Sequence, residues 1–174
     1  MASNDKKKIS ISQFSSPIGT IITGALPEGV VFLEFLSEDN PDAQWERLKK
    51  KFDGEFTEDK NKHLENLKEQ LALYFEGKLK KFDIPVIFFG TEFQKKVWNE
   101  LLSIDYGKTR SYGEQARAIG KPKAARAIGG AVGDNPISIV VPCHRVIGSD
   151  GSLTGFGGGI PRKIFMLDLE KKYS

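Results

Sequence analysis

Residues 142–146, Pro-Cys-His-Arg-Val, contain the side chains of this chain best suited to covalent chemistry. A thiolate is a strong nucleophile, and cationic neighbours such as His144 and Arg145 favour ionisation of the Cys143 thiol. A base that takes the thiol proton also needs an acid to orient it, and Glu170 is the candidate. The alternative is an inert cysteine, because a lone cysteine usually behaves as a small buried hydrophobe.

The direct adjacency of Cys143 and His144 limits how they act together. Successive side chains of an extended backbone point to opposite faces, and those of a helix diverge by about 100°. Direct pairing of the thiol with the imidazole is therefore disfavoured. We expect a bridging water molecule or a local turn to connect them.

Composition excludes several other kinds of chemistry. The 174 residues include one cysteine and two histidines, which rules out an intramolecular disulfide, a redox dithiol and the usual cysteine-based zinc sites. The glycine-rich residues 155–159 match neither common nucleotide-binding loop. We therefore expect no metal, no cofactor and a reducing compartment.

Nothing in the sequence suggests a membrane protein. The longest apolar stretches, such as residues 137–142, are far too short to cross a bilayer. The first residues also lack the apolar region of a secretory signal. We expect no membrane partner.

Hydrophobic spacing predicts a β-then-α arrangement in the first half of the chain. Alternating apolar residues and turn residues predict an antiparallel meander, and two amphipathic stretches predict helices that cover it. The expected strands are residues 9–12, 20–25 and 30–36, and the expected helices are residues 42–52 and 63–75. Residues 84–89 are expected to form an extended connection.

A change in pattern and charge places the domain boundary near residue 86. Residues 1–86 contain 13 basic and 15 acidic residues, a balance of −2, whereas residues 87–174 contain 13 and 8, a balance of +5. The predicted domains are therefore residues 1–86 and 87–174. A basic second domain is compatible with a polyanionic partner.

The second half predicts a helix-turn-helix. Capping-box patterns at residues 91–94 and 111–114 open two helices, and Pro122 is expected in the first turn of a third helix. That third helix is rich in alanine and glycine, which would let it approach a narrow minor groove closely. The alternative is that Ala124, Ala125, Ala127 and Ala131 only pack against a neighbouring helix. Residues 138–141 are expected to form a buried strand before Pro142.

Taken together, these motifs resemble the O6-alkylguanine-DNA alkyltransferases, also called methylated-DNA–protein-cysteine methyltransferases. The resemblance covers residues 87–172. It is carried, in order and spacing, by residues 110–114, 122–131, 135–136, 142–146, 155–156, 158–159 and 170.

The resemblance implies a fold and an activity. It implies an α/β protein with an N-terminal RNase H-like domain and a C-terminal, mostly helical, winged helix-turn-helix domain that carries the active site. Such a protein binds alkylated double-stranded DNA through the minor groove, flips the damaged base and moves the alkyl group from guanine O6 to Cys143 once. O4-alkylthymine is a further candidate substrate.

The resemblance also implies the setting of this activity. No cofactor or metal takes part, and the protein is expected to act as a monomer. Its expected location is the cytoplasm, near the nucleoid, or the nucleus if the source is eukaryotic.

The resemblance further implies roles for the catalytic residues. Cys143 is the nucleophile, and His144 accepts its proton through a water molecule while Glu170 orients the imidazole. Tyr112 donates a hydrogen bond to guanine N3 and so stabilises the leaving group. Lys163 lies near the pocket with no assigned role, and Arg145 is a structural or phosphate-binding residue.

The substrate and the DNA would be bound by other parts of the second domain. Arg126 would fill the gap that the flipped base leaves. Asn135 would hold the recognition helix against the active-site segment, and Phe156, where relatives often have tyrosine, would form a wall of the pocket. The backbone of Val146 and the amide of Gly157 would contact the guanine. The remaining predicted DNA contacts are Ala125, Ala127, Gly129 and Ser111.

Three other functions are weaker hypotheses than alkyl transfer. A damage sensor without chemistry would replace the cysteine, so Cys143 argues against it. A plain winged-helix DNA-binding module leaves Tyr112 and Glu170 without a role. A Cys-His hydrolase would need direct pairing of Cys143 with His144, which their adjacency disfavours.

Overall fold

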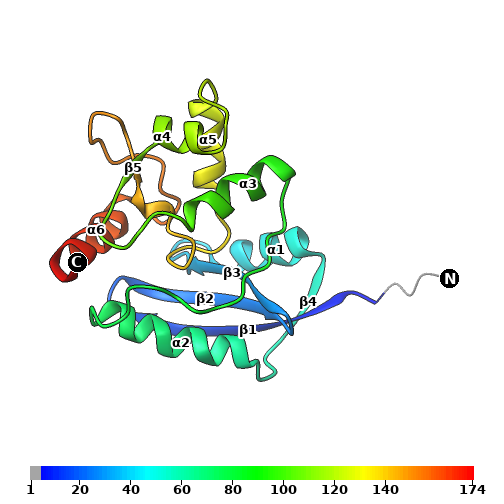
Figure 1. Cartoon of the computed structure of the whole chain (residues 1–174). Helices are drawn as coiled ribbons and strands as arrows, with labels where there is room; N and C mark the ends of the chain where they lie inside the picture. The colour runs from blue at the N-terminus through cyan, green and yellow to red at the C-terminus, as the bar shows by residue number, and fades with distance from the viewer. Residues whose placement is uncertain (1–4) are drawn as a thin grey trace.

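The N-terminal part of the chain forms a four-stranded mixed sheet (Figure 1). The structure is a computed structural model and describes residues 5–174. The strands are β1 (Lys7–Ser16), β2 (Gly19–Leu26), β3 (Gly29–Phe35) and β4 (Gly54–Thr57), in the order β3-β2-β1-β4. The first three form the predicted antiparallel meander, whereas β4, which pairs parallel with β1, was not predicted.

Two helices cover opposite faces of this sheet. They are α1 (Pro41–Phe52) and α2 (Lys62–Phe75), each within one residue of its predicted start. Consecutive residues of β2 point to opposite faces. Ile21 packs in the core that includes α2, and Ile22 packs in the core that includes α1. The sheet is therefore apolar on both sides, and the Ile21 core continues into the second half of the chain.

The C-terminal part is mostly helical (Figure 1). Its elements are α3 (Glu92–Leu101), β5 (Arg110–Ser111), α4 (Tyr112–Ala118), α5 (Ala125–Gly133), the 3-10 turn η1 (Cys143–Arg145), β6 (Val146–Ile147) and α6 (Ile160–Tyr173). Both predicted capping boxes are present, at the starts of α3 and α4. Helices α3, α4 and α5 pack on one another, with the turn that a helix-turn-helix requires between α4 and α5.

Two local predictions in this part are wrong. Helix α5 begins at Ala125, so Pro122 lies in the turn before it and not in its first turn. Residues 138–141 form a tight turn instead of a strand, with Ile139 in the left-handed region at φ 71°. The residue just before this segment, Ile137, forms a parallel bridge to Leu33 of β3.

The connection between the two parts remains paired with the N-terminal sheet. Ile87 donates its amide to the carbonyl of Val30 at 2.9 Å, and Val30 donates to Pro85 at the same distance. The predicted domain boundary at residue 86 falls in this extended connection and stays a prediction. Within residues 5–174, no helix combines the length and apolar character that a membrane crossing requires.

Candidate active site

Cys143 opens the 3-10 turn η1 and is almost completely buried, with 4% of its surface exposed. Its amide donates to the carbonyl of Val141 at 2.8 Å, and the amide of Arg145 donates to the carbonyl of Pro142 at 3.0 Å. A local turn is therefore present at Cys143 and His144, whereas the connection of the thiol with the imidazole stays a prediction. The turn directs His144 and Arg145 towards α6, which packs against η1.

A buried carboxylate on α6 binds both residues that follow the cysteine. Nε2 of His144 lies 2.7 Å from Oε2 of Glu170, and Nε of Arg145 donates to Oε1 of Glu170 at 2.7 Å. Nη1 of Arg145 donates to the carbonyl of Ile104 at 2.6 Å. His144 and Glu170 are at most 1% exposed. Arg145 is therefore a structural partner that compensates the charge of Glu170.

The charges of this group are set by burial and by the pairing. Burial lowers the pKa of His144 below its usual value, although the hydrogen bond that His144 donates to Glu170 acts in the opposite direction. Burial alone would raise the pKa of Glu170, but hydrogen bonds from His144 and Arg145 hold that pKa below its usual value. At neutral pH the arrangement is a neutral imidazole, a carboxylate and a guanidinium.

The neutral His144 has one ring nitrogen available. With Nε2 engaged by Glu170, Nδ1 is the acceptor nitrogen, and within residues 5–174 it has no hydrogen-bond partner. Nδ1 belongs to the residue next to Cys143. The site therefore holds a buried base, oriented by an acid, beside a buried thiol.

The Cys143 thiol is not ionised by its neighbours as the sequence suggested. Burial raises its pKa, while the Asn135 side chain and the positive charge of Lys163 act in the opposite direction. The charge of Arg145 is compensated by Glu170, and His144 is neutral. In the free protein Cys143 is thus a protonated thiol that needs a base.

Tyr112 is connected with the segment that follows the cysteine turn through Thr154 and Lys163. Its hydroxyl donates to the carbonyl of Thr154 at 2.8 Å, and the Nζ of Lys163 donates to the same carbonyl at 3.1 Å and to the carbonyl of Val146 at 2.5 Å. A Cβ on Gly155 would lie 2.8 Å from the Tyr112 hydroxyl, and Gly155 has φ 69°, so glycine is required there. Thr154 was not predicted because it acts through its carbonyl, which has no sequence signature.

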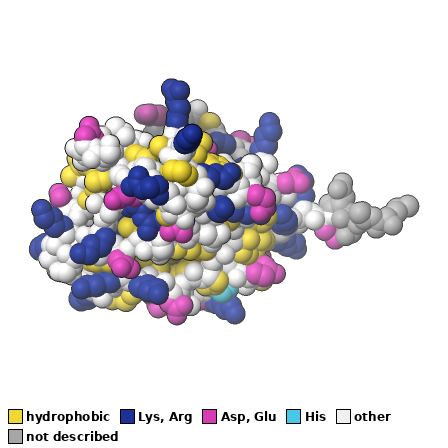
Figure 2. Space-filling view, turned by 45° about the horizontal axis from the view of Figure 1, so that its top comes forward, with side chains coloured by type: hydrophobic (Ala, Val, Ile, Leu, Met, Phe, Trp, Pro, Cys, Tyr) yellow, Lys and Arg dark blue, Asp and Glu magenta, His cyan; other side chains and the backbone are white. Residues whose placement is uncertain are grey.

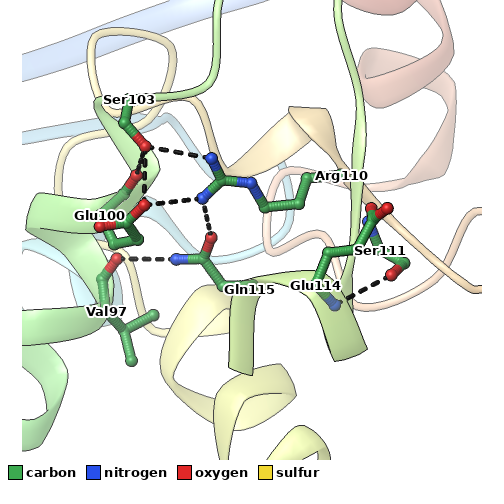
Figure 3. A network of polar contacts seen from close by, with 7 residues as sticks. All are labelled: Val97, Glu100, Ser103, Arg110, Ser111, Glu114 and Gln115. Carbon is green, nitrogen blue, oxygen red and sulfur yellow. Dashed lines mark hydrogen bonds and ion pairs between the residues drawn. The ribbon is translucent and has the colours of Figure 1, made fainter. Parts of the chain in front are cut away.

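A polar network fixes the start of α4, where Tyr112 lies (Figure 3). Nη1 of Arg110 donates to Oε1 of Glu100 at 3.0 Å and to Oε1 of Gln115 at 2.8 Å. Gln115 is fully buried and donates to the carbonyl of Val97 in α3 at 3.1 Å. The sequence analysis missed this network, although a glutamine among the apolar positions of a short helix was a signal for it.

Asn135 links the end of α5 to the turn before the cysteine. Its side-chain nitrogen donates to the carbonyl of Val141 at 2.8 Å, and its oxygen accepts from the amide of Ile137 at 3.0 Å. The predicted role of Asn135, to hold the recognition helix against the active-site segment, stays a prediction with which these bonds are compatible. Phe156 is buried in the core, and Gly157 lies on an exposed turn beside Gly133.

Helix α5 has one packed face and one open face. Ala131 is buried, whereas Ala125, Arg126 and Ala127 are exposed. A Cβ on Gly129 would lie 3.9 Å from the Tyr112 ring, so this glycine faces the site. Packing against a neighbouring helix therefore explains only part of the small-residue pattern.

The open face of α5 lies in a basic region. The basic residues of α4, α5 and their turn are Arg117, Lys121, Lys123 and Arg126, and all four are exposed. Figure 2, in which this end of the molecule comes forward, shows Lys and Arg side chains around apolar patches. The hydroxyl of Ser111 accepts from the amide of Glu114 at 3.1 Å, so that side chain is used as a helix cap.

A cleft of about 790 Å³ runs from Cys143 towards the N-terminal part. Its lining also includes Gly157 and Gly158 from the glycine-rich loop and Glu34 and Arg47 from the N-terminal part. Within residues 5–174, no three His, Cys, Asp or Glu side chains are grouped so that they could hold a metal ion.

Comparison with known proteins matches both parts of the chain to one family. Residues 10–88 match the family model "6-O-methylguanine DNA methyltransferase, ribonuclease-like domain", and residues 92–172 match "6-O-methylguanine DNA methyltransferase, DNA binding domain". The chain is 46% identical over 148 residues to the inducible methylated-DNA–protein-cysteine methyltransferase of Bacillus subtilis, covering 84% of this chain and 82% of that protein.

Mycobacterial relatives are more similar over a shorter range. The methylated-DNA–protein-cysteine methyltransferase of Mycolicibacterium paratuberculosis is 59% identical over 106 residues, which cover 61% of this chain and 64% of the relative, less than two thirds of its length. The crystal structure of the Mycobacterium tuberculosis protein in complex with DNA is similar over 95% of this chain and 94% of that chain, with 42% identity and a TM-score of 0.81.

The raised pKa of Cys143 predicts how the free protein reacts with iodoacetamide. The pKa of Cys143 in the folded protein lies above the ordinary cysteine value of 9.0, and only the thiolate reacts. The alkylation rate should therefore still be rising at pH 9 and above. Peptide mapping by mass spectrometry between pH 7 and pH 10 reports this rate at Cys143, the sole cysteine of the sequence, separately from the slower alkylation of lysine side chains. The urea-unfolded protein is the control, and a rate that levels off below pH 9 in the folded protein would contradict the assignment.

Proposed function

This chain belongs to the 6-O-methylguanine DNA methyltransferase family, and from its site we propose that it repairs DNA by transferring the alkyl group of O6-alkylguanine to Cys143. The observation that carries the proposal is the buried Cys143, followed directly in the sequence by a buried imidazole that Glu170 orients and whose Nδ1 has no hydrogen-bond partner among residues 5–174. One chain carries all these groups, so we propose that it acts as a monomer.

The proposed reaction is a displacement at carbon with a simple proton balance. His144 takes the thiol proton through a water molecule, and the Cys143 sulfur forms a bond to the alkyl carbon as the bond from that carbon to guanine O6 breaks. The guanine leaves as an anion and takes up a proton. The product is a thioether, which no group of the site can hydrolyse, so each molecule acts once.

Tyr112 is proposed to stabilise the leaving guanine by donating a hydrogen bond to N3. A tyrosine hydroxyl has one proton to donate, and in the free protein it is donated to the carbonyl of Thr154. Binding of the base therefore has to exchange one acceptor for the other. Lys163 keeps that carbonyl paired when Tyr112 leaves it.

The open face of α5 is proposed to bind the minor groove of double-stranded DNA. The DNA complex of the Mycobacterium tuberculosis protein and the basic residues around α5 support this. Exposed Ala125 and Ala127 allow close approach, and the exposed Arg126 is long enough to occupy the space of a base that has left the stack. The contribution of Ser111 would come from its backbone, because its hydroxyl caps α4.

Intact-protein mass after mixing with excess O6-methylguanine DNA is the direct test of the proposed function. We expect one added methyl group per chain, located on Cys143 by peptide mapping. Cys143→Ala should bind the same DNA and gain no mass. Binding without any mass change in the unaltered protein would instead identify a sensor, and transfer by the variant would remove Cys143 as the nucleophile.

The lowered pKa of His144 predicts the pH dependence of the transfer. The neutral imidazole is the active form, so lowering the pKa extends activity to more acidic solutions. The single-turnover rate at saturating DNA should be constant around pH 7 and should fall only well below pH 6.5, the ordinary histidine value. Rapid-quench measurements check this, with DNA affinity measured at each pH as the control. An acidic limb centred at or above pH 6.5 would contradict the proposed state of His144.

Arg126→Ala tests the flipping role separately from the chemistry. Loss of the side chain that replaces the base should slow transfer from duplex DNA by about tenfold, while the rate with free O6-methylguanine base stays within about twofold. Arg117→Ala, which removes an exposed arginine from α4, is the matched control for charge. Equal losses on both substrates would refute the role of Arg126.

A further inference from the structure

Two successive residues in the first turn of α6 reach in different directions. Lys163 is fully buried and binds the carbonyls of Val146 and Thr154, next to the proposed guanine-binding residues. Arg162 is half-buried and reaches the N-terminal sheet. The start of α6 is therefore a junction between the pocket and the N-terminal part of the chain.

The Arg162 guanidinium binds both parts of the molecule at once. Its Nε donates to the carbonyl of Ile18, in the turn between β1 and β2, at 2.7 Å. Its Nη1 donates to the carbonyl of Gly158, in the glycine loop of residues 155–159, at 2.9 Å. The guanidinium carbon also lies 4.5 Å from the centre of the Phe35 ring at the end of β3.

The surroundings of Arg162 are shaped to hold this guanidinium. A Cβ on Gly19 would lie 2.7 Å from Nη2, and Gly19 has φ 121°, so glycine leaves the space that the guanidinium fills. A Cβ on Gly158 would lie 2.6 Å from the Phe156 ring and 3.0 Å from the Phe35 ring. Gly158 is thus packed between Phe156 of its own loop and Phe35 of β3, and its carbonyl binds Arg162.

Arg162 has carbonyl partners only. Among residues 5–174 it forms no ion pair with a carboxylate, and both hydrogen-bonded groups are main-chain oxygens. A planar guanidinium holds two acceptors in a fixed relative geometry, which a lysine ammonium does not. The side chain therefore fixes the distance between the β1–β2 turn and the glycine loop.

We propose that Arg162 is a positioning residue through which the N-terminal sheet holds the glycine loop in the geometry needed for alkyl transfer. The proposal rests on the proposed function and on the predicted contact between the amide of Gly157 and the guanine. Gly157 directly precedes the residue that Arg162 binds. A small displacement of a group that contacts the reacting atoms has a large effect on rate.

The test compares Arg162→Met, Arg162→Lys and the matched control Lys171→Met, which changes an exposed residue of the same helix. For Arg162→Met we expect the transfer rate at saturating O6-methylguanine DNA to fall by about tenfold, while the dissociation constant for that DNA stays within about twofold. The loss should be similar with free O6-methylguanine base. The transfer rate of Arg162→Lys should lie between those of Arg162→Met and the unaltered protein. The rate of Lys171→Met should match that of the unaltered protein.

Hydrogen exchange provides a readout that does not depend on activity. In Arg162→Met, the amides of residues 155–159 should exchange faster than in the unaltered protein, while those of η1 remain protected. This measurement still tests the positioning role if the unaltered protein transfers no methyl group, a result that would refute the proposed function alone.

Three results would overturn the proposal. The first is an unchanged saturating rate and unchanged exchange in Arg162→Met. The second is a weakened DNA affinity with an unchanged saturating rate, which would identify Arg162 as a phosphate contact. The third applies if Arg162→Met does not fold. A transfer rate and an amide exchange of residues 155–159 that are both unchanged in a folded Arg162→Lys would then show that the two hydrogen bonds of the guanidinium are not needed.

Discussion

The burial of the Glu170 carboxylate is the constraint on which the rest of the site depends. A charge in a protein interior is tolerated only when it is paired and fully hydrogen-bonded, and Glu170 meets this condition with two partners from the same short turn. Because both partners follow Cys143 directly, the docking of α6 also fixes where the thiol lies. Burial keeps His144 neutral in spite of this pairing, and because Nε2 is engaged by Glu170, Nδ1 is left as the nitrogen that can accept a proton.

The N-terminal sheet takes part in this arrangement through β3. Leu33 exchanges main-chain hydrogen bonds with Pro136 and Ser138, at 2.9 and 3.1 Å, and so supports the turn that leads to the cysteine. Phe35, two residues further along, packs against the opposite wall of the site at Gly158. The two walls of the cleft thus share one rigid strand. Residues of β3 belong to a core that continues into the C-terminal part. The sheet has no catalytic residue, but through β3 it supports the geometry of the site.

The features that the sequence predicts well are those with a local signature. The spacing of apolar residues predicted α2, and the capping-box patterns predicted where α3 and α4 begin. Strand β4 escaped prediction because four residues carry no clear alternation and its pairing with β1 is set by tertiary contact. The β-branched residues 138–141 suggested a strand, but the amide of Asn135 supplies hydrogen bonds that favour a turn. The roles of Thr154 and Gly158 lie in their carbonyls, which any residue has.

The order of the elements along the chain has a consequence for biosynthesis. Domains form as the chain leaves the ribosome, N-terminal elements first. The sheet with β3 is therefore complete before the Cys143 turn emerges, and α6 follows later with Arg162, Lys163 and Glu170. Until that helix docks, the nascent polypeptide carries a thiol without an oriented base. The His144 base is therefore oriented only after α6 has been synthesised and has docked against the cysteine turn.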